Sequence, residues 1–149
     1  MKSWLIVAVS LKLLKLAQNS IVSIYSLRAL NSTSAKVVQI RRSSDSVLQD
    51  FSADINGNLT TNLGISLLTW LNGASGYLAI WYDQSGNRKH ATQTNTSYQP
   101  KIDITNKQVD FKTASFFYLP DGTVPYGNTN YTFVTKHNTI NSSNPTTAG

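Results

Sequence analysis

The chain contains no cysteine and no glutamate, and these absences exclude several kinds of site. Without cysteine it can form neither disulfides nor thiolate metal sites. All seven acidic residues are aspartate, so any carboxylate that takes part in acid–base chemistry would be an aspartate. The two histidines, His90 and His137, have no carboxylate at ligand spacing, which predicts surface histidines rather than a metal site.

Basic residues are in excess but are scattered. Thirteen lysines and arginines against seven aspartates give a net charge of +6 over 149 residues. The only adjacent basic pairs are Arg41-Arg42 and Arg88-Lys89, whereas nucleic-acid-binding proteins usually cluster their charge on one face. We therefore expect no nucleic-acid partner, and the length suits a single domain.

Residues 1–18 form the only long apolar segment. Lys12 and Lys15 fall on one face of a helix and leave an apolar face opposite. The pattern predicts a retained amphipathic helix about 25 Å long that anchors the chain to a membrane interface or to partner subunits. A cleaved secretory signal ending near Ala17 is the alternative, and the segment is short and charged for a transmembrane span. The expected anchor residues are Trp4, Leu5, Ile6, Val9, Leu13 and Leu16.

Residues 19–137 read as one mainly β domain, followed by a flexible polar tail at 138–149. Apolar and polar residues alternate over Lys36–Arg42, as in a half-buried strand. Residues 21–30 fit a strand or a short helix, and Asn56-Gly57 predicts a turn. Leucine and tryptophan spacing over 63–71 predicts one internal helix that is capped near 60–62 and ends at Asn72-Gly73. Further strands are expected at 77–82, 101–104, 107–111, 115–119 and 131–136.

Four motifs together resemble a known family. They are Trp81-Tyr82-Asp83-Gln84-Ser85-Gly86 with Ala91-Thr92-Gln93, Tyr25-Ser26-Leu27-Arg28, Arg41-Arg42-Ser43-Ser44-Asp45, and Gln49-Asp50. The set resembles the N-terminal part of the catalytic domain of α-L-arabinofuranosidase B and related laminin-G-like modules. That resemblance covers about 20–137 and implies a concanavalin-A-like (jelly-roll) β-sandwich.

The resemblance also implies that the sandwich is incomplete. Lys112 and Thr113 stand where the family usually has Asp-Gly, and the strands expected after 131–136 are absent. The chain is then a minimal version, a fragment, or a sheet that another chain completes by strand addition.

The motif at 81–87 is the candidate ligand site. Asp83, Ser85 and Asn87 could hydrogen-bond a sugar that stacks on Trp81 or Tyr82. The alternative is structural, with Trp81 in the core and Asp83 capping its own turn.

Two other motifs have structural interpretations. We expect Arg41 or Arg42 to face inward and to pair with Asp45, Asp50 or Asp83. We interpret 54–58 as a hairpin turn rather than a calcium loop, because the calcium-ligand spacing does not match.

No catalytic residue is predicted. In the arabinofuranosidases the catalytic Glu and Asp lie downstream of the part that this chain resembles, and no aspartate here matches either position by motif. We expect a non-catalytic structural or attachment module of a surface assembly, such as a virion minor capsid or envelope-associated protein. Its expected partners are other subunits, with glycan and, through residues 1–18, membrane as further candidates; no metal or cofactor is expected.

Two alternatives remain open at this point. One is a secreted carbohydrate-binding (lectin-like) module. The other is a fragment of an arabinofuranosidase-like glycoside hydrolase. Each of these functions places the protein on a virion, on a cell surface or outside the cell.

Overall fold

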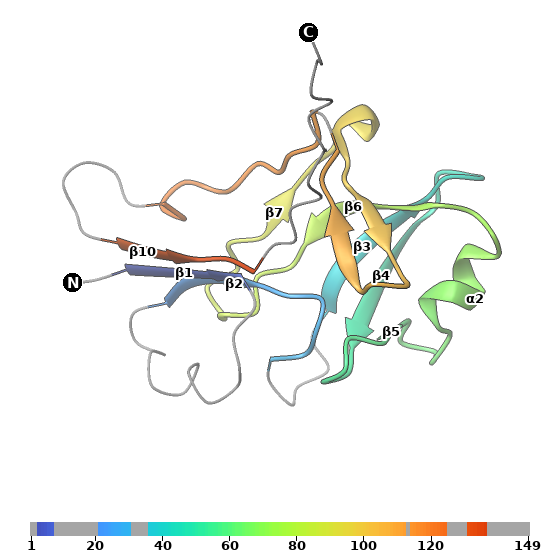
Figure 1. The fold of residues 1–149 in the computed structure, drawn as a ribbon, viewed down its shortest axis with the longest axis horizontal. Coiled ribbons are helices and arrows are strands. Elements are labelled where there is room, and N and C mark those ends of the chain that lie inside the picture. The colour runs from blue at the N-terminus through green and yellow to red at the C-terminus, as the bar shows by residue number, and fades with distance from the viewer. Residues whose placement is uncertain (1–2, 8–20, 31–35, 113, 125–130, 137–149) are drawn as a thin grey trace, which may run out of the picture.

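The computed structural model describes residues 3–7, 21–30, 36–112, 114–124 and 131–136. These residues are mainly β, as predicted, with little helix. They form a curled antiparallel sheet and a small parallel sheet that lies to one side of it (Figure 1). The expected jelly-roll sandwich stays a prediction, and the expected tail at 138–149 lies outside the described residues.

The curled sheet has seven strands in the order β5-β4-β3-β6-β8-β9, and β7 also pairs with β6. Every pairing in it is antiparallel. The strands predicted at 36–42, 77–82, 101–104 and 107–111 are confirmed within a few residues. The strand bounds are β3 (Lys36–Arg42), β4 (Leu48–Ala53), β5 (Leu59–Thr60), β6 (Gly76–Trp81), β7 (Ala91–Thr92), β8 (Lys101–Asp103) and β9 (Gln108–Asp110).

The second sheet joins distant parts of the chain. Strand β1 (Ser3–Val7) lies between β2 (Ile21–Tyr25) and β10 (Tyr131–Val134), and both pairings are parallel. The three strands lie side by side at the left of Figure 1. Residues 21–30 therefore begin with a strand, which settles the choice between strand and helix, and 131–136 contains the predicted strand.

The predicted N-terminal helix is wrong at Ser3–Val7. These residues form β1, because two neighbouring strands provide hydrogen-bond partners along both of its edges and the run Trp-Leu-Ile-Val suits a strand. Of the predicted anchor residues, Trp4, Leu5 and Ile6 lie in β1. Val9, Leu13 and Leu16 lie outside the described residues. Within the described ranges, no helix has the length and apolar character needed to cross a bilayer.

The internal helix is shorter than predicted. Helix α2 (Leu67–Leu71) starts at Ser66, whose hydroxyl accepts a hydrogen bond from the amide of Thr69. The preceding residues form a turn instead, since the Thr61 hydroxyl accepts from the amides of Leu63 and Ile65. The helix ends as expected at Asn72, which is left-handed with φ 47°.

Residues 115–119 do not form the predicted strand. In the part of this segment that the structure describes, the backbone makes a single bridge, between Tyr118 and Thr92. The segment thus contacts the curled sheet at β7 without extending the sheet.

The main core fills the space between the curled sheet and α2. Gly76 shows how tightly it packs, because an added Cβ would lie 2.8 Å from Cγ2 of Ile102 and 3.0 Å from Cγ2 of Ile40. The buried members are Leu27, Val37, Val38, Ile40, Phe51, Leu59, Leu67, Leu71, Leu78 and Ile102.

Candidate functional site

Asp83 lies at the centre of the candidate site, two residues after the end of β6, and is buried. Oδ1 accepts hydrogen bonds from the amides of Ile24 at 2.8 Å and Ser85 at 2.9 Å. Oδ2 accepts from the Ser85 hydroxyl at 2.8 Å and from the amide of Lys89 at 3.0 Å. Four donors of the chain itself therefore occupy the two oxygens, and a ligand at Asp83 would have to displace them.

The residues after Asp83 hold the segment around β2. The Gln84 side chain accepts from the amide of Leu30 and donates to the carbonyls of Ser26 and Arg28. Asn87 Nδ2 donates to the carbonyls of Ile21 and Val22 at 2.9 and 3.0 Å. This turn therefore supplies several backbone partners of 21–30, in addition to the pairing with β1, from positions 54 to 66 residues later in the sequence.

The two aromatic residues of the motif face different neighbours. Trp81 is half-buried and packs between Tyr25 and Phe117, at ring-centroid distances of 6.0 and 6.2 Å. Among the described residues the buried Trp81 Nε1 has no hydrogen-bond partner. The Tyr82 hydroxyl donates to Asp50 at 2.8 Å, which links β6 to β4.

His90, which the sequence predicts to be a surface histidine, is half-buried. Its ring packs edge-on against Tyr82, with centroids 5.0 Å apart, and Nδ1 accepts from the amide of Asp83. The second predicted surface histidine, His137, lies outside the described residues.

Of the five predicted ligand residues, Asp83, Ser85 and Asn87 are therefore joined by hydrogen bonds, while Trp81 and Tyr82 pack against other parts of the chain. This arrangement matches the structural alternative for Asp83. Ligand binding by Trp81, Tyr82, Asp83, Ser85 and Asn87 stays a prediction.

Two buried glutamines form a second network that sequence reasoning missed. Gln93 Nε2 donates to the carbonyl of Phe116 at 3.0 Å, and Oε1 accepts from the amide of Asn95 at 2.9 Å. Gln99 donates to the carbonyl of Gln93 and accepts from Nε of Arg41 at 2.7 Å. The sequence does not predict their burial, because the polar segment around them lacks the alternation of apolar and polar residues that indicates a buried face.

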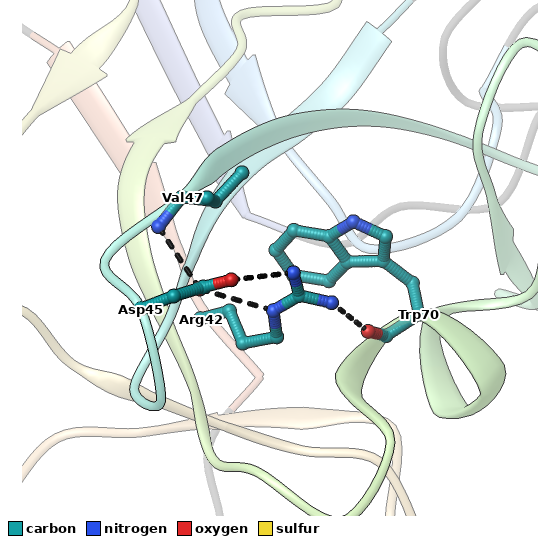
Figure 2. A network of polar contacts seen from close by, with 4 residues as sticks. All are labelled: Arg42, Asp45, Val47 and Trp70. Carbon is teal, nitrogen blue, oxygen red and sulfur yellow. Dashed lines mark hydrogen bonds and ion pairs between the residues drawn. The ribbon is translucent and has the colours of Figure 1, made fainter.

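Arg42 fastens the β3–β4 hairpin to α2 (Figure 2). Its guanidinium makes two hydrogen bonds to the Asp45 carboxylate, at 3.1 and 2.6 Å, and donates to the carbonyl of Trp70 at 2.5 Å. It also lies 4.6 Å from the centroid of the Trp70 ring. Of the predicted pairings, Arg42 with Asp45 is observed, while Arg41 lies over Tyr77.

The 54–58 segment is a hairpin turn, as predicted. Asp54 Oδ1 accepts from the amides of Asn56 and Asn58, both at 2.8 Å. The ammonium of Lys107 donates to the carbonyl of Asn56 and to Oδ1 of Asn58. Across the described ranges, no group of three or more histidines and carboxylates could hold a metal ion.

Four carboxyl groups have a lowered pKa. The Arg42 side chain lowers the pKa of Asp45, Asn58 that of Asp54, and Asn106 that of Asp103. Burial works to raise the pKa of Asp50, but hydrogen bonds from Lys36, Tyr82 and Gln39 outweigh it and the net shift is downward. These four groups are charged at neutral pH, whereas a glycosidase acid needs a raised pKa.

No family model, curated protein or solved structure matches the chain. The resemblance to the α-L-arabinofuranosidase B domain therefore stays a prediction from the motifs alone.

Proposed function

We propose that this protein is a non-catalytic structural and attachment module of a surface assembly, such as a virion minor capsid or envelope-associated protein. The observation that carries the proposal is the outer edge of β4. Strand β5 pairs only with Ser52 and Ala53, so no described strand lies beside residues 48–51 on the side away from β3. Such an edge can accept a strand from another chain.

Apolar side chains accompany this edge. Leu48 is 52 % exposed, and Val47 before it is 45 % exposed. Large apolar side chains beside an open strand edge favour a partner that covers both. In this proposal the curled sheet supplies one part of a jelly-roll sandwich, and a strand of another subunit extends it.

The lowered pKa values of four carboxyl groups argue against a role as general acid. Four of the seven aspartates have a lowered pKa. A carboxyl group that is held ionised is a poor general acid.

Leu48→Lys tests the proposal, because a lysine on an open edge opposes strand addition. The full chain, expressed where it is naturally made, should cosediment with particles or envelopes, and Leu48→Lys should reduce the bound fraction at least fivefold. Leu63→Lys is the matched control, since Leu63 is exposed but lies outside β4. A wild-type chain found only as a free monomer would contradict the proposal.

Carbohydrate binding is the second candidate, favoured by an exposed aromatic cluster. Phe116 packs against Tyr98 and Tyr118 at centroid distances of 5.2 and 5.1 Å, and Tyr118 is 62 % exposed. Solvent-facing rings with polar edges are common in recognition sites.

A glycan array with Tyr118→Ala tests this candidate better than Asp83→Ala, because loss of Asp83 would disturb the packing of β2. Binding that Tyr118→Ala abolishes and Val124→Ala retains would support it, since Val124 is exposed and has no ring contact in the cluster. Absence of glycan binding by the wild-type chain would contradict it.

A further inference from the structure

Another surface feature shares no lining residue with the 81–87 motif, the open edge of β4 or the aromatic cluster at Phe116. A groove of about 240 Å³ opens between the 54–58 turn, α2 and β8. Its size is below the roughly 300–1,000 Å³ of pockets for drug-sized molecules, so it suits a single narrow chain. The aliphatic side chains that line it are Leu27, Leu59, Leu67, Leu68, Ile102 and Ile104.

The groove also has a cation among its lining residues. Lys107 donates to two neutral oxygens, the carbonyl of Asn56 at 3.0 Å and Oδ1 of Asn58 at 2.8 Å. In the part of the chain that the structure describes, Lys107 forms no ion pair within 4 Å. One of the three ammonium hydrogens is therefore available to another acceptor.

The backbone at Lys107 strengthens this observation. Its φ of 52° lies in the left-handed region, which favours glycine or asparagine. A lysine is conformationally unfavourable at this position. Glycine or asparagine would fit the backbone better, but neither would supply an ammonium group.

Nearby acids do not neutralise this cation by direct contact. Asp103 also lines the groove, but its oxygens accept hydrogen bonds from the backbone and side-chain nitrogens of Asn106. Asp54 is similarly bonded to Asn56 and Asn58 within its own turn.

We infer that this groove binds an unbranched aliphatic chain that carries a terminal carboxylate, with the chain against the leucines and isoleucines and the carboxylate on Lys107. An apolar groove beside an ammonium that has one hydrogen available complements both halves of such a molecule. Medium-chain alkyl carboxylates, from hexanoate to decanoate, are suitable probes.

Calorimetric titration of the full chain below each probe's micelle concentration tests the inference. Each added methylene should tighten binding about fourfold until the groove is filled. Octanoate should bind about two- to fivefold more tightly than octanol, because an exposed ion pair contributes little. Methyl NMR should show shifts at Leu67 and Ile102.

Two substitutions separate the halves of the site. Lys107→Met should remove the preference for octanoate over octanol, and Leu68→Gln should weaken both ligands. Leu68 is 67 % exposed, so this change leaves the core intact, and Leu63→Gln at 79 % exposure, outside the lining, is its control. No binding by the wild-type chain, or binding unchanged in both Lys107→Met and Leu68→Gln, would overturn the inference.

Discussion

At the scale of single residues, Asp83 makes the contacts that matter most for the fold around β2. Its carboxylate is buried, yet its recorded partners are neutral amides and a hydroxyl of the chain itself. A buried charge is tolerated only when hydrogen bonds replace water, and here four of them do so. The same residue therefore follows the end of β6 and positions the backbone of β2 at Ile24.

Asp83→Asn should lower the free energy of unfolding by about 2–4 kcal/mol. The amide NH2 that replaces one carboxylate oxygen would face donors, whichever way the side chain turns. Chemical denaturation measures the loss. Asp110→Asn is the control, because the ion pair of Asp110 with the exposed Lys112 is long, at 3.7 Å, and its loss should change stability by less than about 0.5 kcal/mol.

Asp50 should make the stability sensitive to acid. Lys36, Tyr82 and Gln39 hold its pKa below the ordinary value, although burial opposes them. These contacts stabilise the folded protein above the unfolded-state pKa, near 3.9, and their contribution is lost as the pH falls through the folded-state pKa.

Asp50→Asn should therefore lose less stability than the wild type between about pH 5 and pH 2. Urea midpoints measured across this range provide the check. Some acid sensitivity should remain, since the pKa values of Asp45, Asp54 and Asp103 are also lowered. Parallel pH profiles for the variant and the wild type would show that Asp50 is not responsible.

Tyr25 shows the opposite shift. Burial raises its pKa to about 12, and its hydroxyl donates to the carbonyl of Lys89. The raised pKa means that the neutral phenol is favoured in the folded protein. Its hydrogen bond to Lys89 connects β2 with the turn that follows Asp83.

At the scale of elements, local patterns predicted the central strands well. The alternation over Lys36–Arg42 and the aromatic run before Asp83 identify β3 and β6, which lie side by side in the curled sheet. The start of α2 was less predictable, because the Thr61 hydroxyl diverts residues 61–65 into a turn.

Strand β1 shows why other elements could not be predicted. An apolar run with mixed helical and strand preference takes the structure that its neighbours in space support. For β1 these neighbours are β2 and β10, and β10 lies near the other end of the sequence. The candidate site has the same limit. Its spacing indicated the turn at Asp83, but not the contacts with residues 21–30.

Gly76→Ala tests the packing of β6 against the core. An added methyl would crowd Ile102 and Ile40, so we expect a loss of about 1–3 kcal/mol in the free energy of unfolding. Ser75→Ala, one residue earlier, adds no volume and is the control. Equal stability of Gly76→Ala and the wild type would mean that β6 and β8 can move apart at no cost.

At the scale of the whole molecule, β1 connects the beginning of the chain with a strand near its end. Removing residues 1–7 would leave β2 and β10 without the strand that lies between them. Hydrogen exchange should then become at least tenfold faster in β10, while amides of β3 keep their protection, because β3 pairs with β4 and β6. Unchanged exchange in β10 would contradict the parallel pairing.

Strand β1 also overlaps the predicted anchor at 1–18. Deletion of residues 1–18 removes β1 as well as any anchoring function, so a loss of assembly in that variant has two explanations. Leu48→Lys avoids this ambiguity because it alters one exposed edge.

The contacts of Asp83 also set an order of events during synthesis. Ile24 precedes its acceptor by 59 residues, which at about 5–20 residues per second corresponds to roughly 3–12 seconds of translation. The β3–β4 hairpin, whose strands are close in sequence, can form on the ribosome within that interval. The amide of Ile24 must wait for this acceptor, and a nascent chain stalled before Asp83 would leave that amide without it.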